Sequence, residues 1–186
     1  DTETTPDTGF PPPSCAALDT TRDGYVEVTD SASLRLASGP FTIEAWGYAI
    51  AQAAGCASSL ISKRGPGSAE GWHLYMEGLM CHPTRYIGFQ VSGGVDPYIV
   101  STRPTPLNRW FHIAVTYDPA ISTATLWLDG TSVGIVTLPA PRATSFPLRI
   151  AHDTNAETPY PWNGYLAEVR ISSVVRYTST FSPSAT

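Results

Sequence analysis

The chain has 186 residues, enough for one β domain and a tail, and 42% of them are hydrophobic, 11% aromatic and 15% charged. The net charge is −5, and the lack of a basic patch argues against nucleic acid or an anionic membrane as a partner. No apolar run approaches the roughly 20 residues of a membrane span, so we expect no membrane insertion. Few charges beside many aromatic, Thr and Ser residues are typical of an extracellular or cell-surface β protein. The chain starts at Asp1 without a signal peptide, so we expect a removed signal or a larger parent protein.

Residues 1–14 differ in composition from the rest of the chain. They consist mostly of Thr, Pro and acidic residues, with Phe10 as the one apolar side chain. Such a segment buries too little surface to offset its ordering entropy, so we expect an extended linker with Pro11, Pro12 and Pro13 in polyproline II conformation. The alternative is an arm in which Phe10 and these prolines contact a neighbouring subunit. The threonines beside prolines are candidates for O-linked glycan.

From Cys15 to residue 186 we expect one domain built of strands and turns. Short apolar or alternating runs, separated by Gly, Pro and Asp turn signals every 8–12 residues, predict about a dozen strands. The predicted strands are Ala16–Leu18, Tyr25–Val28, Phe41–Ala49, Leu60–Lys63, Trp72–Glu77, Tyr86–Val91, Tyr98–Ser101, Arg109–Tyr117, Ala124–Leu128, Ser132–Thr137, Leu148–Ala151 and Tyr165–Ile171. Ser31–Leu36 predicts one helical turn.

Two stretches carry the strongest structural signal. In Arg109–Asp118, Phe111, Ile113, Val115 and Tyr117 alternate with polar or smaller residues, as in a strand with a buried face. Further along, Asp129-Gly130 separates two apolar runs, and this pair favours a tight hairpin in which both turn residues have positive φ. A long buried strand followed by a tight hairpin predicts an all-β fold, an antiparallel two-sheet β-sandwich of the jelly-roll type.

The three cysteines predict one disulfide. Cys56 precedes one strand and Cys81 follows the next, so a hairpin that sets Arg64 near Trp72 brings the two cysteines to the same open end. We therefore expect a Cys56–Cys81 bond, which implies an oxidising compartment; the alternative is two buried free thiols. Cys15 is then unpaired, either free or bonded to another chain.

Several segments resemble a known family. They are "AALDTTRDGYVEVTDSASLRLASGPFTIEAW", "LISKRG", "LNRWFHIAVTYD", "LWLDGTSVG", "LRIAHD" and "WNGYLAEVRISSVVRY", and they cover nearly everything after Cys15. In order and spacing they resemble the laminin-G-like (LamG) jelly roll of the concanavalin A-like lectin/glucanase superfamily. The resemblance implies the sandwich fold, which hosts lectins, glycosidases, adhesins and spacers alike.

The strand carboxylates do not match the hydrolases of this superfamily. Those enzymes carry two acids with an Asp between them at alternating positions of one strand, whereas Glu44 and Glu168 each stand alone in their strands. We expect Glu168 to pair with Arg170 or another basic residue, and we expect no enzymatic activity. Trp46 and Trp110 are interpreted as core anchors.

The resemblance also implies a calcium ion near the first and last strands. The family's last strand usually begins with an Asp that resembles a common calcium ligand, and this chain has Ala167 there, which argues against that site. The remaining candidate oxygen donors are Asp19, Asp23, Asp153 and Glu168, which could equally be surface turn acids. The four histidines lack the spacing of a zinc site.

Two segments combine aromatic and polar side chains as sugar sites do. The candidate ligand-binding residues are Tyr160, Asn155 and Asp153 in the loop "HDTNAETPYPWNG", and Trp72 and Tyr75 in "GWHLYMEG". Trp162 lies in the same loop, but we expect it to pack in the core.

The sequence is compatible with two functions. The first is a non-catalytic extracellular recognition or adhesion module that binds a glycan or a cell-surface protein. The alternative is a structural subunit of an extracellular filament or surface assembly, in which the N-terminal arm contacts a neighbouring subunit.

Overall fold

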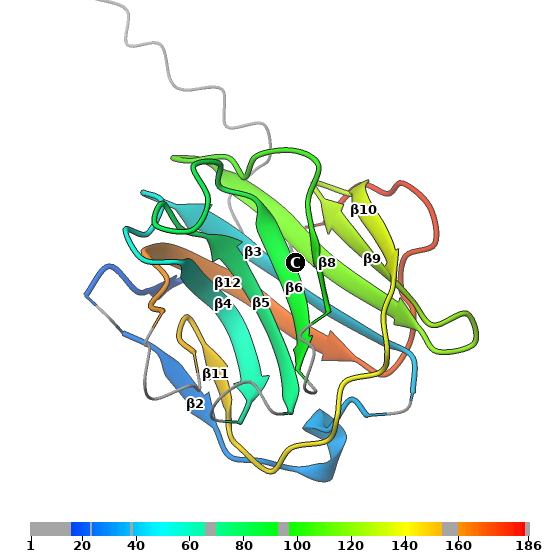
Figure 1. Ribbon diagram of the computed structural model, residues 1–186. Helices are drawn as coiled ribbons and strands as arrows, with labels where there is room; N and C mark the ends of the chain where they lie inside the picture. The colour runs from blue at the N-terminus through cyan, green and yellow to red at the C-terminus, as the bar shows by residue number, and fades with distance from the viewer. Residues whose placement is uncertain are drawn as a thin grey trace, which may run out of the picture.

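Two antiparallel six-stranded sheets face each other across a shared apolar core in the computed structural model (Figure 1). The structure describes residues 16–22, 24–37, 39–65, 70–92, 97–153 and 160–184. Within these ranges the strands are β1 (Leu18–Asp19), β2 (Val26–Val28), β3 (Phe41–Ala49), β4 (Ala57–Arg64), β5 (Gly71–Glu77), β6 (Ile87–Ser92), β7 (Tyr98–Val100), β8 (Trp110–Asp118), β9 (Thr123–Leu128), β10 (Thr131–Thr137), β11 (Leu148–Ile150) and β12 (Gly164–Ser172). One turn of 3-10 helix, η1 (Ala32–Leu34), lies where a helical turn is predicted.

The strand order confirms the predicted sandwich. One sheet, called here the β3 sheet, has the order β1-β12-β3-β8-β9-β10, and the other, the β5 sheet, has the order β2-β11-β4-β5-β6-β7. In Figure 1 the β5 sheet faces the viewer, with the β3 sheet behind it. No helix in the described ranges has the length and apolar character needed to cross a membrane.

Strand β8 shows why these residues form a two-layered fold. Phe111, Ile113, Val115 and Tyr117 all point between the sheets and are at most 2% exposed. Because successive strand residues face opposite sides, burying this row commits the alternate row to the outer face of the sheet. The alternation read from the sequence is confirmed.

Of the two predicted tryptophan anchors, Trp46 is buried and Trp110 is not. Trp46 is 1% exposed, but it belongs to the outer face of the β3 sheet, where its ring lies 5.4 Å from that of His112. The C-terminal segment, red in Figure 1, helps to cover this face through Phe181, whose ring lies 5.7 Å from those of His112 and Trp127. Trp110 is half-buried against Tyr48, so its assignment as a core anchor is wrong.

The Asp129-Gly130 turn and the disulfide are both present as predicted. Asp129 and Gly130 have φ values of 52° and 72°. Cys56 and Cys81 are bonded with their Cα atoms 4.8 Å apart. The strand register differs by one residue from the expected one, because Arg64 pairs with Gly71 and Lys63 with Trp72. Cys15 and residues 1–14, with the proposed arm Phe10–Pro13, lie outside the described residues.

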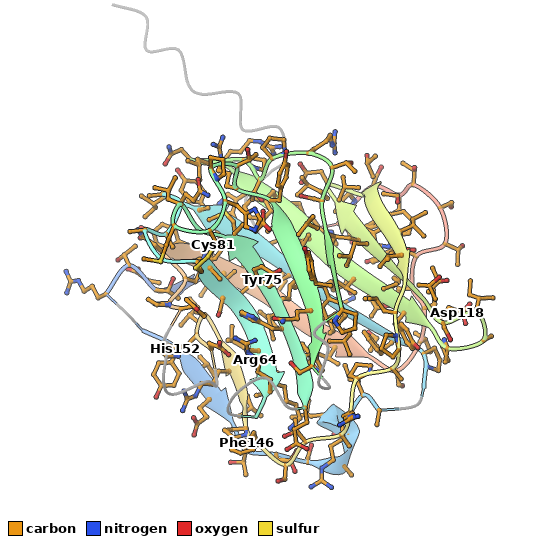
Figure 2. The ribbon with its side chains drawn as sticks, in the orientation of Figure 1. Arg64, Tyr75, Cys81, Asp118, Phe146 and His152 are labelled. Atoms are coloured by element: carbon orange, nitrogen blue, oxygen red, sulfur yellow. A yellow bond between two sulfur atoms is a disulfide. The ribbon has the colours of Figure 1, made fainter. Side chains whose placement is uncertain are left out.

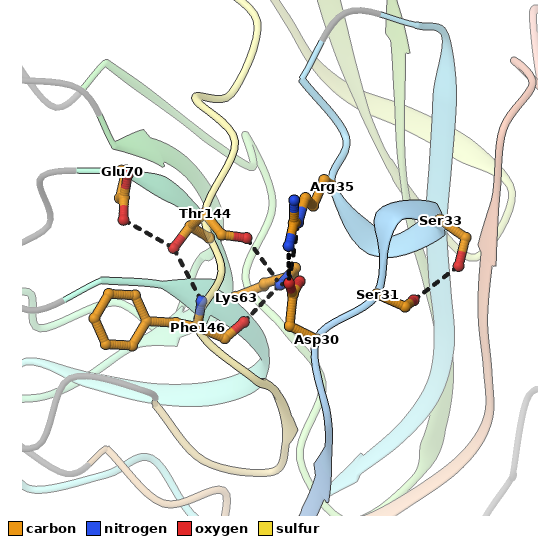
Figure 3. Close-up of polar contacts among 8 residues, drawn as sticks. All are labelled: Asp30, Ser31, Ser33, Arg35, Lys63, Glu70, Thr144 and Phe146. Atoms are coloured by element: carbon orange, nitrogen blue, oxygen red, sulfur yellow. Dashed lines mark hydrogen bonds and ion pairs between the residues drawn. The ribbon is translucent and has the colours of Figure 1, made fainter.

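Lys63, a buried lysine near the end of β4, binds the segment after β2 and the segment before β11 (Figure 3). Lys63 is 1% exposed, and its Nζ donates to Asp30 Oδ1 at 2.6 Å and to the carbonyl oxygens of Thr144 at 3.2 Å and Phe146 at 2.5 Å. Three acceptors match the three N–H groups of an ammonium, which satisfies a charge that burial would otherwise penalise. Hydrogen bonds from Arg35 and Lys63 lower the pKa of Asp30 to about 2.

Candidate functional site

The outer face of the β5 sheet contains a hollow of about 300 Å³. Its lining comes from three adjacent strands and the loops at their ends: Ala57 and Arg64 on β4, His73, Tyr75 and Glu77 on β5, Gln90 on β6, and Cys56, Cys81, His82 and Tyr160 from loops. Figure 2 shows Arg64 and Tyr75 on the face of this sheet turned to the viewer. We call this hollow the β5 pocket.

The alternation of β5 creates the pocket floor. Trp72, Leu74 and Met76 are at most 1% exposed and belong to the core between the sheets. The residues between them therefore point outward, and three consecutive outward positions carry His73, Tyr75 and Glu77. A single strand thus supplies both a wall of the core and a row of polar side chains.

Arg64 is held in place by a buried carboxylate. Its Nε donates to Asp153 Oδ1 at 2.9 Å, a second nitrogen is ion-paired with Asp153 Oδ2, and Nη1 donates to Gln90 Oε1 at 3.1 Å. Burial alone would raise the pKa of Asp153, but the hydrogen bond and charge of Arg64 and the Ser62 hydroxyl lower it to about 2. The pair is therefore ionised at neutral pH and fixes the guanidinium in one orientation.

Two rings lie side by side on the pocket floor. The rings of His73 and Tyr75 stack with centroids 4.9 Å apart, and His73 Nε2 shares a 2.7 Å hydrogen bond with the hydroxyl of Ser59. Burial and the nearby charge of Arg64 lower the pKa of His73 to about 3, so its imidazole is neutral at physiological pH. Gly88 on β6 leaves room for Tyr75, because a Cβ there would lie 2.4 Å from the tyrosine Cζ.

Glu77 is the carboxylate of the pocket lining. Its side chain is almost wholly buried, and Oε1 lies 3.3 Å from Nε2 of His82, which is 52% exposed at the rim. The second oxygen, Oε2, has no hydrogen-bond partner among the described residues. Burial raises the pKa of Glu77, and the charge of His82 opposes this rise.

The rim of the pocket is closed by the disulfide and by Tyr160. Cys56 and Cys81 both line the pocket, and the backbone beside them is joined by a 2.8 Å hydrogen bond from Gly78 N to the Cys56 carbonyl. Tyr160 accepts a 2.8 Å hydrogen bond from Ser59 N at its carbonyl, and its half-buried side chain faces the pocket. The bond between the cysteines thus fixes the loop that carries His82.

The predicted ligand residues fall in different places. Tyr160 and Tyr75 come together in the β5 pocket, while Asp153 lies beneath it as the partner of Arg64. Trp72 packs in the core and Asn155 lies outside the described residues. The pocket residues that the sequence analysis missed are Arg64, His73, Glu77, His82 and Gln90.

The candidate calcium donors are not gathered at one point. Asp19 accepts hydrogen bonds from the backbone and hydroxyl of Thr21, which lower its pKa, and both carboxylate oxygens of Asp153 are taken by Arg64. Glu168 lies on β12, in the other sheet from the pocket, and Asp23 lies outside the described ranges. In those ranges no three His, Cys, Asp or Glu side chains form a metal cluster. Among the described residues, these candidates are therefore not brought together as a calcium cage, and a calcium ion stays a prediction through which we derive no step.

Glu44 and Glu168 share a small cavity on the outer face of the β3 sheet. Its volume is about 30 Å³, which is close to the space of one water molecule and far too small for a sugar ring. Glu44 is engaged by Arg176 at 3.0 Å and by the Tyr177 hydroxyl at 2.5 Å. Arg170 on β12 pairs with Glu44 at 3.6 Å. Through Arg176 and Tyr177, Glu44 anchors the C-terminal segment to the β3 sheet.

With this geometry in view, the comparisons define the class of protein. A family model described as the concanavalin A-like lectin/glucanase superfamily matches residues 19–179. The chain belongs to this family. No match emerges among curated proteins.

Solved structures share the fold at low sequence identity. A candidate carbohydrate-binding protein from Bacteroides ovatus is 20% identical, with a TM-score of 0.63 over 82% of this chain and 42% of its own. The CBM40 of the Ruminococcus gnavus IT-sialidase, solved with α2,3-sialyllactose, is 14% identical, with a TM-score of 0.60 over 82% of this chain and 91% of its own. A pentraxin from Limulus polyphemus is 12% identical, with a TM-score of 0.53 over 83% of this chain and 77% of its own. The chain spans less than half of the Bacteroides protein.

Proposed function

We propose that this chain is a non-catalytic glycan-binding module and that the β5 pocket is its sugar site. The observation that carries the proposal is the lining of this pocket, in which two tyrosines and five polar side chains surround about 300 Å³. That volume lies at the lower end of the range of roughly 300–1,000 Å³ for small-ligand pockets. The fold it shares with carbohydrate-binding modules supports the same function.

The side chains suit a sugar in kind and in arrangement. A sugar ring presents hydroxyl groups around its edge and C–H groups on its faces, so a site needs hydrogen-bonding groups beside an aromatic surface. Gln90, His82 and Glu77 supply hydrogen-bonding groups, and Tyr75 and Tyr160 supply aromatic surface. Packing and hydrogen bonds hold the floor residues before any ligand arrives, which limits the entropy lost on binding.

The pocket chemistry favours binding over hydrolysis. Glycoside hydrolysis generally uses a pair of carboxyl groups on either side of the scissile bond. Among the described residues that line the β5 pocket, Glu77 is the one carboxylate. We therefore assign the site a recognition role.

Replacing Tyr160 by alanine tests this proposal. Tyr160→Ala removes aromatic surface at the rim, and we expect glycan affinity to fall at least about tenfold, or ~1.4 kcal/mol. A glycan array identifies the ligand, and isothermal titration with that ligand measures the loss. Tyr25→Ala is the matched control, because Tyr25 is 46% exposed and lies outside the pocket. Unchanged affinity in Tyr160→Ala would remove this tyrosine from the site.

We also propose an extracellular or cell-surface location for the module. The support is the Cys56–Cys81 bond, since disulfides persist in oxidising compartments. A cell-surface protein as partner and self-assembly through residues 1–14 remain predictions. Size-exclusion chromatography and electron microscopy with and without residues 1–14 test the assembly, which requires polymers that disappear on truncation.

A further inference from the structure

We infer that the β5 pocket binds uncharged, hydroxyl-rich sugars and excludes acidic ones, with Glu77 as the residue that sets this preference. The inference rests on the proposed glycan-binding function and specifies its ligand class. Three observations support it. Arg64 is already bound by Asp153 and Gln90, no other Lys or Arg side chain lines the pocket, and the buried carboxylate of Glu77 has an oxygen without a hydrogen-bond partner among the described residues.

The one guanidinium in the pocket is already neutralised. Both oxygens of Asp153 bind Arg64 from below, and Gln90 accepts from a third nitrogen of the same group. Asp153 is 0% exposed, so a ligand carboxylate cannot displace it without opening the sheet surface. An acidic sugar would therefore meet a guanidinium whose charge is balanced and whose three nitrogens already donate to Asp153 and Gln90.

The other cationic side chains of the chain do not supply the positive charge that an acidic sugar would need in this pocket. All 11 Lys and Arg residues and all four His residues lie in the described parts of the chain, and of the Lys and Arg side chains Arg64 alone lines the pocket. His73 is buried and neutral, and His82 is positioned 3.3 Å from the Glu77 carboxylate. The residues outside the described ranges include no Lys, Arg or His and so add no positive side chain.

Glu77 makes the pocket an acceptor site. Its carboxylate is 4% exposed, and one oxygen has no hydrogen-bond partner in the part of the chain that the structure describes. A buried acceptor without a donor is unfavourable, and a sugar hydroxyl that donates to it would form a charge-assisted hydrogen bond. A sialic acid carboxylate or a sulfate ester has no proton to donate and would be repelled by the same group. Hydroxyl donors and negative charges are thus distinguished by one side chain.

Matched glycans test the inference on the unmodified chain. The array presents N-acetyllactosamine and other neutral glycans beside the same glycans capped with sialic acid or sulfate. We expect the neutral member of each bound pair to bind at least tenfold more tightly. In Glu77→Gln, which keeps the shape and removes the charge, we expect neutral affinity to fall about tenfold and the discrimination to shrink. Glu27→Gln, an exposed carboxylate outside the pocket, is the matched control.

The outcomes separate the two proposals. If no glycan binds, the glycan-binding function itself fails. If glycans bind in a Tyr160-dependent way but the acidic members bind as well or better, the function stands and the inference is overturned. Unchanged discrimination in a folded Glu77→Gln, as judged by circular dichroism and thermal unfolding, overturns the role of Glu77. If this variant does not fold, the neutral-to-acidic ratio of the unmodified chain decides the ligand class.

Discussion

At the scale of single residues, the stability of the pocket depends on the ion pair between Arg64 and Asp153. Asp153→Asn leaves a buried guanidinium without its counter-charge, and breaking a buried pair in this way costs about 3–5 kcal/mol. We expect a loss of this size in the free energy of unfolding, measured by urea denaturation. Asp19→Asn is the control, because Asp19 is exposed and an asparagine also accepts the hydrogen bonds of Thr21. Equal stability of the two variants would show that Asp153 is dispensable.

The same carboxylate predicts how stability depends on pH. The pKa of Asp153 falls from 3.8 to about 2 on folding, so the unfolded chain binds this proton more tightly than the native one does. The contribution of Asp153 is therefore complete above pH 4 and is lost as the pH falls towards 2. Unfolding measured between pH 5 and 2 should show a steeper decline for the unmodified chain than for Asp153→Asn.

At the scale of elements, the β9–β10 hairpin is coupled to the C-terminal segment through one glycine. Gly130 has a φ of 72°, and a Cβ there would lie 1.8 Å from the carbonyl oxygen of Phe181. Gly130→Ala should therefore strain the turn and displace the segment, at a cost of about 1–3 kcal/mol in unfolding free energy. Gly39→Ala is the control, because nothing lies within 4 Å of its added Cβ. Thermal unfolding of both variants measures the difference, and equal midpoints would contradict this account.

The elements themselves were largely predictable, because their signals are local. The alternation in Arg109–Asp118 and the Asp129-Gly130 pair each fix a backbone geometry within a few residues, and both are confirmed. Trp110 is the first residue of β8 and belongs to the row opposite Phe111, so the same alternation places it on the outer face and not in the core. At the Arg64 end of β4 the register differs from the expected one by one residue, and a bulge between Ser59 and Ile61 shifts the pairing again towards Ala57.

The site was predictable only in part, because it is assembled across strands. Tyr75 and Tyr160 were found by their composition, but nothing local connects Gln90 on β6 with Arg64 on β4. The run "WHLYME" could have predicted two more of these residues, because strand alternation places His73 and Glu77 on the same face as Tyr75. The pairing of Arg64 with Asp153 spans 89 positions and follows from the fold alone.

At the scale of the whole molecule, the two sheets share one core, so a constraint on one hairpin acts on the stability of the entire domain. The Cys56–Cys81 bond closes a loop of 25 residues that contains β4, β5 and the pocket floor. Closing a loop of this length restricts the unfolded chain and stabilises the native state by about 3–4 kcal/mol in the chain-entropy model. We expect the double variant Cys56→Ser and Cys81→Ser to lose this amount in a single cooperative urea transition, while its circular dichroism spectrum remains that of a β protein. A local transition of the hairpin ahead of global unfolding, or an unchanged unfolding free energy, would show instead that the backbone bond from Gly78 N to the Cys56 carbonyl suffices to hold the two ends together.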